Sequence, residues 1–129
     1  MNRRIALGLA TLAGAALGAA AVNGLHAQAK PSTYVVVAIR KINDAEVFKT
    51  GVVDKASPAA LAASGGHYVI RTQNITSLDG TPPQRFVLIA FDSAEKAQAW
   101  HNSAAQKEVD AARLKSTDSL SFVVDGIAN

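Results

Sequence analysis

Residues 85–91 run Arg-Phe-Val-Leu-Ile-Ala-Phe, and this stretch decides the fold. Its apolar residues occupy both alternations of an extended chain, so it predicts a strand whose two faces are both buried. The prolines at positions 82–83 cannot donate hydrogen bonds to a sheet, so the strand begins after them. Asp92 or Ser93 then caps a helix, and Glu95, three residues after Asp92, fits a capping box.

The chain after this strand predicts a broken helix and a last strand. The first helical stretch carries three residues at i, i+3 and i+7 spacing, which places them on one face: Ala97, Trp100 and Ala104. A break follows near Asn102 and Ser103, and a second helical stretch covers residues 105–115. Residues 119–124, Ser-Leu-Ser-Phe-Val-Val, predict the last strand.

Upstream, the chain predicts another central strand and two helices. Residues 33–39, Thr-Tyr-Val-Val-Val-Ala-Ile, form an uncharged, β-branched run that predicts a second doubly buried strand. Asn43 or Asp44 caps the helix that follows. Ser57, with Pro58 at the first helical position, starts a second, short helix.

An edge strand and a hairpin turn are predicted between that short helix and the opening stretch. The glycines at 65–66 end the helix, since glycine reaches the left-handed cap conformation at low cost. Residues 67–72, His-Tyr-Val-Ile-Arg-Thr, predict the strand, and a prolongation to residue 78 stays open. Asp79 followed by Gly80 is typical of a tight hairpin.

The predicted order, β-α-β-β-α-β, is that of a ferredoxin-like α+β sandwich, in which a four-stranded antiparallel sheet carries helices on one face. The strands at 33–39 and 85–91 are apolar on both alternations, whereas the two helical segments can cover only one face. The simplest cover for the second face is the same face of a second copy. We therefore expect a homodimer through the sheet face, a dimeric α/β barrel.

The first 29 residues have the order of a secretory signal peptide. Arg3 and Arg4 precede residues 5–22, which carry no charge, and Ala27-Gln28-Ala29 is a small-x-small cleavage site. The sequence therefore predicts a signal peptide at 1–29 and a single domain at 30–129, periplasmic or secreted, with no membrane attachment after cleavage. An uncleaved anchor is the alternative, and both the Sec and twin-arginine routes stay open.

Charge and cysteine content narrow the partners of the domain at 30–129. Without Arg3 and Arg4 the 13 basic residues become 11, against 10 acidic ones, and they are scattered. The domain therefore offers no basic cluster to a nucleic-acid backbone. The chain has no cysteine, so no disulfide supports the fold.

Five segments, in order and spacing, give the chain a likeness to a known family: 65–71, Gly-Gly-His-Tyr-Val-Ile-Arg; 78–80, Leu-Asp-Gly; 85–93; 97–100, Ala-Gln-Ala-Trp; and 124–126, Val-Asp-Gly. Together they resemble the family catalogued as domain of unknown function 1330. The resemblance implies a ferredoxin-like subunit of the dimeric α/β-barrel superfamily and no established activity. Related barrel families include cofactor-free monooxygenases, lactone isomerases and haem proteins, so the fold alone does not identify a reaction.

The chain departs from that family's pattern at three places. The family often has a basic residue where this chain has His67, and a tyrosine after the tryptophan where this chain has His101. It commonly has Pro-Glu-Tyr where this chain has Ala-Ala-Gln at 104–106. If the family's aromatic residues line a pocket, the pocket of this chain is more polar or wider.

Four residues are candidate ligand-binding residues because they combine polar reach or a π-face with positions beside apolar elements: His67, Arg71, Trp100 and His101. Regular strand alternation places His67, Val69 and Arg71 on one face, where they could bind an anion. The alternatives are a solvated strand edge for that pair of polar residues and plain helix–sheet packing for Trp100.

Other polar residues indicate structure rather than chemistry. The histidines at 67 and 101 have no ligand partner at helical spacing, so no metal and no cofactor is expected. Arg85 and Arg113 are expected to form structural ion pairs with Asp79, Asp118 or Asp125, and substrate binding is their alternative role.

Three functions remain open from the sequence. The first is an exported protein that binds a small anionic or aromatic metabolite. The second is a cofactor-independent enzyme acting on such a molecule, so whether the chain is an enzyme stays open. The third is a purely structural dimer. A polar cluster around one cavity favours the second function, and a filled interior favours the third.

Overall fold

The computed structural model describes residues 32–127, and the signal peptide predicted at 1–29 lies outside them. The elements follow the predicted order: β1 (Thr33–Ile42), α2 (Ala45–Phe48), the π-helical segment η1 (Lys49–Val53), α3 (Pro58–Ala63), β2 (Gly66–Thr72), β3 (Arg85–Phe91), α4 (Ala94–His101), α5 (Ala104–Ser116) and β4 (Thr117–Asp125). The four strands form one sheet in the order β2-β3-β1-β4, and every neighbouring pair is antiparallel. This topology confirms the ferredoxin-like α+β sandwich.

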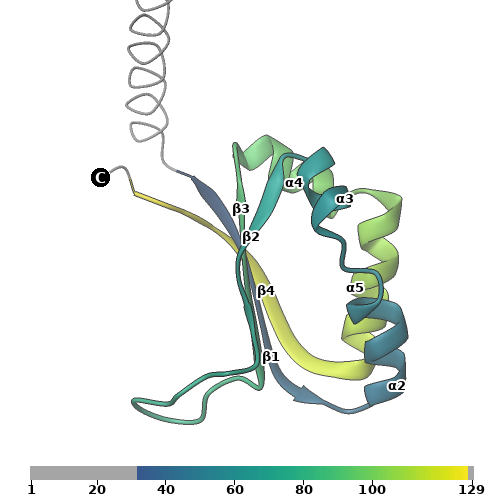
Figure 1. Cartoon of the computed structure of the whole chain (residues 1–129), viewed down its shortest axis with the longest axis vertical. Helices are drawn as coiled ribbons and strands as arrows, with labels where there is room; N and C mark the ends of the chain where they lie inside the picture. The colour runs from purple at the N-terminus through teal and green to yellow at the C-terminus, as the bar shows by residue number, and fades with distance from the viewer. Residues whose placement is uncertain (1–31, 128–129) are drawn as a thin grey trace, which may run out of the picture. The chain divides into compact units, whose positions relative to one another are not determined.

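The described helices all lie on one side of the sheet (Figure 1). The two runs that are apolar on both alternations, β1 and β3, occupy the centre, and β2 lies at an edge as predicted. Val35 of β1 lies opposite Ile89 of β3 and Val123 of β4, so these three side chains share the face that the helices cover. We call it the helix face and the other side the open face.

The core lies between the helix face and the helices. Its buried cluster consists of Val35, Leu61, Ile89, Phe91 and Ala97, with Trp100 packed against it. The rings of Phe91 and Trp100 have centroids 5.3 Å apart at an interplanar angle of 45°. A tilted aromatic pair of this kind adds to the burial that stabilises the fold.

Side-chain caps start the helices largely where the sequence placed them. Asp44 accepts a hydrogen bond from the Val47 backbone nitrogen at 3.1 Å, and Ser57 caps α3 in the same way. The predicted capping box at Asp92 is wrong: Ser93 is the cap of α4, and the Asp92 carboxylate pairs with the Lys96 Nζ at 3.0 Å. The Ser93 hydroxyl, directly before the first helical residue, accepts a hydrogen bond from the free backbone nitrogen of Lys96. The Asp92 carboxylate is therefore free to pair with the Lys96 side chain, one helical turn further on.

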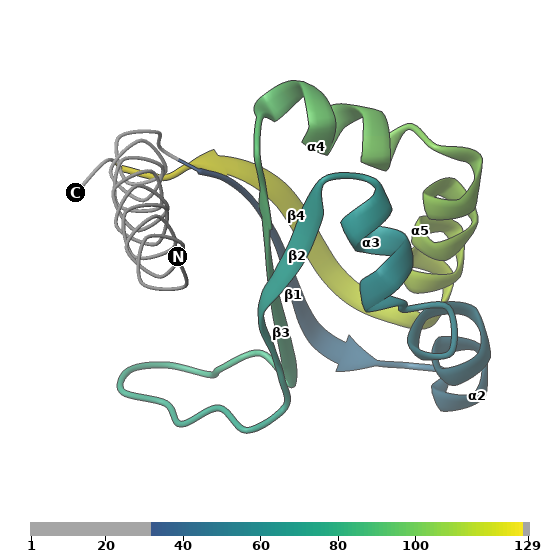
Figure 2. The ribbon, with the colours of Figure 1, turned by 45° about the horizontal axis from the view of Figure 1, so that its top comes forward.

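The connection between β2 and β3 is a long loop rather than a prolonged strand. β2 ends at Thr72, and residues 73–84 extend beyond the sheet before β3 begins (Figure 2). Gly80 has a φ of +74°, which a non-glycine residue adopts only with strain, and prolines follow it. Within the described residues, no helix is long and apolar enough to cross a membrane.

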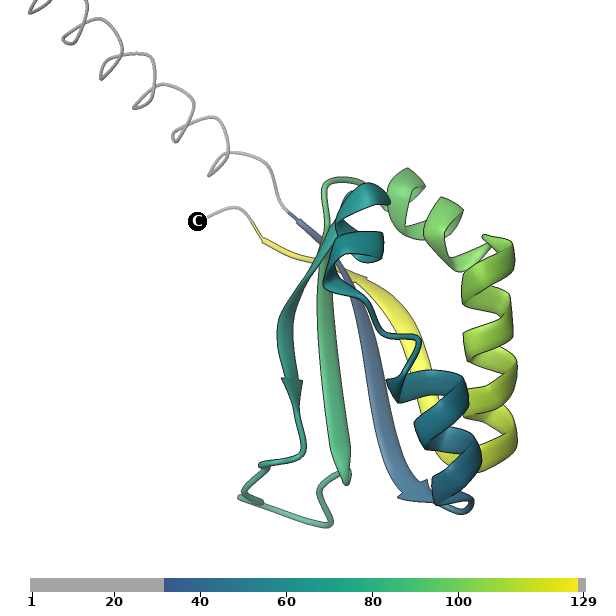
Figure 3. The ribbon, with the colours of Figure 1, turned by 45° about the vertical axis from the view of Figure 1, so that its right-hand side comes forward.

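Figure 3 shows the open face without a described helix against it. Val36, Leu88 and Ile70 lie side by side on it across β1, β3 and β2. Apolar side chains of β2 and β4 on this face remain 38–44% exposed, and they are Ile70, Leu120, Phe122 and Val124. A contiguous apolar surface of this kind is typical of an interface.

Candidate functional site

A groove of about 710 Å³ separates the helices from the helix face of the sheet. We call it the helix-face groove. The sheet contributes Val37, Val87 and Ile89 to its walls, and the helices contribute Phe48 and Val52, among others. Its volume lies in the range of small-molecule pockets, and its walls are largely apolar, as such pockets usually are.

A bulge in β2 decides which side chains enter this groove. Tyr68 lies opposite Ile89 and Ile70 lies opposite Leu88, so Val69 is one extra residue. An extra residue shifts the alternation of every later residue in the strand. The prediction that His67, Val69 and Arg71 share one face is therefore wrong for this strand.

After the bulge, Arg71 lies opposite Val87 on the helix face and lines the groove. Its guanidinium carbon lies 4.7 Å from the centre of the Tyr68 ring, which confirms that both side chains lie on the same side. His67, before the bulge, lies opposite Ala90 and is exposed on the open face.

A second arginine in the groove belongs to β3. The guanidinium carbon of Arg85 lies 5.4 Å from the centre of the Phe48 ring. Arg71 of β2 lies opposite Val87 of β3, and Arg85 is two residues before Val87 on the same strand. The two arginines are therefore diagonal neighbours across the two strands, with Cα atoms about 7–8 Å apart. Within residues 32–127, neither arginine forms an ion pair.

The prediction that both arginines form ion pairs with acidic residues is thus wrong for Arg85. Arg113 does form an ion pair, although with a different acidic residue from those predicted. Arg85 stacks on an aromatic ring instead, and Asp118 pairs with Arg40 at 3.1 Å. Arg113 pairs with Asp110, at 3.6 Å, rather than with a carboxylate named from the sequence. Asp110 is three residues before Arg113 on the same helix, and oppositely charged side chains at this spacing attract one another. This pair could therefore have been predicted from the sequence.

Trp100 and Arg113 stand between the groove and a second cavity. This second cavity, of about 360 Å³, lies beside β4 and the ends of α4 and α5, and we call it the β4-side cavity. Trp100 and Arg113 line both spaces. Trp100 therefore packs on Phe91, as helix–sheet packing predicts, and also lines a cavity, while its part in ligand binding stays a prediction.

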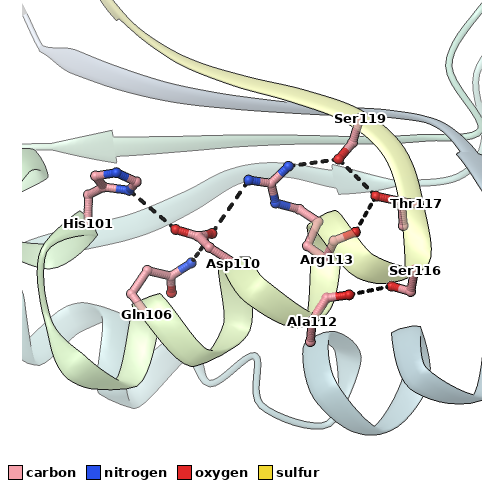
Figure 4. A network of polar contacts seen from close by, with 8 residues as sticks. All are labelled: His101, Gln106, Asp110, Ala112, Arg113, Ser116, Thr117 and Ser119. Atoms are coloured by element: carbon pink, nitrogen blue, oxygen red, sulfur yellow. Dashed lines mark hydrogen bonds and ion pairs between the residues drawn. The ribbon is translucent and has the colours of Figure 1, made fainter.

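A network of polar contacts surrounds Asp110, which lines the helix-face groove, and reaches His101, Arg113 and Ser119, which line the β4-side cavity (Figure 4). The His101 Nδ1 lies 3.3 Å from Asp110 Oδ2, and the Gln106 Nε2 donates to Asp110 Oδ1 at 3.0 Å. Arg113, only 7% exposed, donates from Nη1 to the Ser119 hydroxyl at 2.7 Å. The Ser119 and Thr117 hydroxyl oxygens lie 2.8 Å apart, which extends the network along β4.

The four candidate residues therefore fall at three places. Arg71 and Trp100 line the helix-face groove together. His101 lines the β4-side cavity, and His67 lies on the other side of the sheet. In the described part of the chain, no three His, Cys, Asp or Glu side chains gather as a metal site would require.

Comparisons with known proteins agree with this fold. The matching family model is described as a domain of unknown function (DUF1330) and covers residues 32–127. No curated protein matches the chain in sequence.

Three solved structures share the fold at low identity. A protein of unknown function from Rhodopseudomonas palustris is 14% identical with a TM-score of 0.59, covering 75% of this chain and 83% of that one. A Caulobacter crescentus protein provisionally named an antibiotic biosynthesis monooxygenase is 14% identical with a TM-score of 0.54, covering 77% and 92%. A protein of the same provisional name from Nitrosomonas europaea is 19% identical with a TM-score of 0.51, covering 74% and 98%. These likenesses show the fold alone.

Proposed function

The chain belongs to the DUF1330 family, and we propose that it binds a small molecule with an apolar, aromatic body and an anionic group in the helix-face groove. One observation carries this proposal: Arg71 and Arg85 are neighbours in a largely apolar groove, and neither forms an ion pair among the described residues. An anion that binds between two unpaired arginines is attracted by both charges.

The way the arginines are held suits them to this task. The guanidinium carbons of the two arginines lie over the rings of Tyr68 and Phe48, at 4.7 and 5.4 Å from their centres. The N–H donors of a guanidinium lie in its plane, so stacking leaves them free for a carboxylate, sulfate or phosphate. The apolar walls then receive the body of the ligand.

The open volume of the groove supports binding over a purely structural role. The core is packed against the helices, and beside it the groove, partly open to solvent, offers a volume of about 710 Å³, in the range of small-molecule pockets. A cofactor-independent enzyme remains the alternative function, and its argument from the named neighbours is an analogy of fold only.

We also propose that the domain is exported and acts as a homodimer. The sequence at 27–29 supports cleavage before Lys30, and the apolar open face supports packing against a second copy. Mass spectrometry of the exported protein tests the first statement: the expected chain begins at Lys30. A membrane-bound species that retains Met1 would show an anchor instead.

The binding proposal is tested by calorimetry with two matched pairs of probes. Benzoate and 2-naphthoate carry the proposed anion on an aromatic body, and benzamide and 2-naphthamide lack the charge. We expect the carboxylates to bind more tightly than the amides and to lose affinity with added salt.

Three variants locate the site. Arg71→Gln and Arg85→Gln are each expected to weaken carboxylate binding by about tenfold or more, since a charge-assisted hydrogen bond contributes about 1.5–3 kcal/mol. Arg40→Gln is the control, because Arg40 is an exposed arginine paired with Asp118 outside the groove. Equal binding of acid and amide, or equal loss in all three variants, would contradict the proposal.

A further inference from the structure

We propose that the β4-side cavity is a second, catalytic site, in which His101 acts as a general base toward a small carbon acid and Asp110 positions its ring. A carbon acid here means a molecule whose C–H bond is weakened by a neighbouring electron-withdrawing group. This inference differs from anion binding in the helix-face groove, because its base, His101, lines the β4-side cavity and not the groove, whereas Asp110 approaches His101 from the groove side.

The first step is the contact between the imidazole and the carboxylate. The His101 Nδ1 lies 3.3 Å from Asp110 Oδ2, and a carboxylate at this distance favours the neutral tautomer whose proton is on Nδ1. The lone pair then remains on Nε2, the nitrogen that faces away from the carboxylate. Because the His101 side chain is 59% exposed, that nitrogen is accessible.

The second step is the rigidity of the carboxylate. Its other oxygen, Oδ1, accepts a hydrogen bond from Gln106 at 3.0 Å and lies 3.6 Å from the guanidinium of Arg113. Arg113 is itself fixed by its hydrogen bond to Ser119. Asp110 therefore cannot turn away from His101 without breaking contacts on its far side, which is the arrangement of a base held by an orienting group.

The third step is the space beside the ring. The β4-side cavity holds about 360 Å³ and is lined by His101 itself, so a molecule of one or two rings fits next to the base. Trp100 and Val123 offer it aromatic and apolar surface. Gln98 and Ser121 supply polar groups that can donate to the negative charge that develops when the proton leaves.

The chemistry is redox-neutral and needs no co-reactant. The Nε2 of His101 takes the proton from carbon, the electron pair of the C–H bond moves into the substrate, and the imidazolium later returns the proton to water. Asp110 does not accept the proton, and it stabilises the imidazolium by charge.

The first test uses 5-nitrobenzisoxazole, a carbon acid whose ring opens when a base removes its C–H proton. The N–O bond breaks, and the electron pair becomes a coloured phenolate. We expect saturable turnover by the purified protein, an at least 100-fold loss in His101→Ala and about a tenfold loss in Asp110→Asn, effects on the scale of general-base catalysis. His67→Ala is the matched control, since His67 is the other histidine of the domain and lies on the open face.

The second test has no dependence on turnover. Nitrogen-15 NMR of the histidine rings identifies which nitrogen holds the proton in the neutral form. We expect Nδ1–H for His101, the opposite tautomer for His67, and loss of the difference in Asp110→Asn. Turnover that survives His101→Ala, a His101 tautomer equal to that of His67, or a fixed tautomer without turnover each overturns the proposal.

Discussion

Leu88 and Ile89 are neighbours on β3, and replacing each in turn by lysine separates the stability of the fold from that of the dimer. Ile89 is 3% exposed and lies opposite Val35 in the core. Leu88 lies opposite Val36 on the open face and is only partly buried. The two variants place the same charge on the two sides of one strand.

The lysine at position 89 acts on the fold. Losing the burial of the isoleucine side chain costs about 2 kcal/mol, and an unpaired charge in the core costs about 3–5 kcal/mol more. The sum of about 5–7 kcal/mol is comparable with the whole free energy of unfolding of a domain this size, about 5–15 kcal/mol. We expect Ile89→Lys to be largely unfolded.

The lysine at position 88 acts on the dimer. In a single subunit its ammonium group extends from the open face into water, so the free energy of unfolding falls by only about 1 kcal/mol. In the dimer two such charges are buried, one from each copy, at about 3–5 kcal/mol each. A total of about 6–10 kcal/mol weakens association by at least about ten-thousand-fold, since each 1.4 kcal/mol is tenfold.

Sedimentation velocity measures the mass of each variant, and circular dichroism measures its thermal unfolding. We expect Leu88→Lys to be a monomer that melts cooperatively and Ile89→Lys to show no cooperative melt. Leu88→Met is the control and keeps the dimer. A dimeric Leu88→Lys, or a wild type that is monomeric, would refute the open-face interface, and a native-like melt of Ile89→Lys would refute the register of β3.

Three smaller perturbations probe local structure by denaturant titration. Ser103→Ala removes the hydroxyl that caps α5 by accepting a hydrogen bond from the Gln106 backbone nitrogen at 3.2 Å. The free energy of unfolding is expected to fall by about 1 kcal/mol, and an unchanged denaturation midpoint would contradict the cap. Gly66→Ala places a Cβ 2.7 Å from the Phe91 ring, which is too close for an ordinary contact. The free energy of unfolding is expected to fall by about 1–3 kcal/mol, and an unchanged value would show that the Phe91 ring moves aside. Arg113→Met removes the ion pair with Asp110 and the hydrogen bond to Ser119, and is expected to cost about 1–3 kcal/mol because Asp110 keeps its contacts with Gln106 and His101. A stabilised variant would show that the arginine does not stabilise the fold.

The fold could be predicted from the sequence because its signals are local and agree with one another. The apolar runs at 33–39 and 85–91 became the two central strands, and Ser57 with Pro58 began a helix as expected. The break near Asn102 also lies where α4 ends. Strand burial, caps and helix stops each depend on a few neighbouring residues, so a single sequence displays them.

The site was predictable only in part because its geometry depends on pairing between distant segments. The bulge at Val69 has no signature of its own, since it exists only in the register between β2 and β3. The stacking of Arg85 on Phe48 likewise joins two elements that the sequence separates. The pairs Gln106–Asp110 and Asp110–Arg113 are different, because their helical spacing is visible in the sequence.

One extra residue therefore decides which face of the sheet carries Arg71. If β2 had no bulge, regular alternation would place the side chains of Arg71 and His67 on the same side of the sheet. Both would then lie on the open face, which is proposed to pack against a second copy. The bulge instead sends Arg71 into the helix-face groove beside Tyr68, and leaves His67 on the open face. A buried, unpaired arginine at an apolar interface would cost several kcal/mol, whereas in the groove it remains exposed and available to an anion. The same feature thus keeps the charge of Arg71 off the apolar open face and adds it to the groove, where Arg85 also lies.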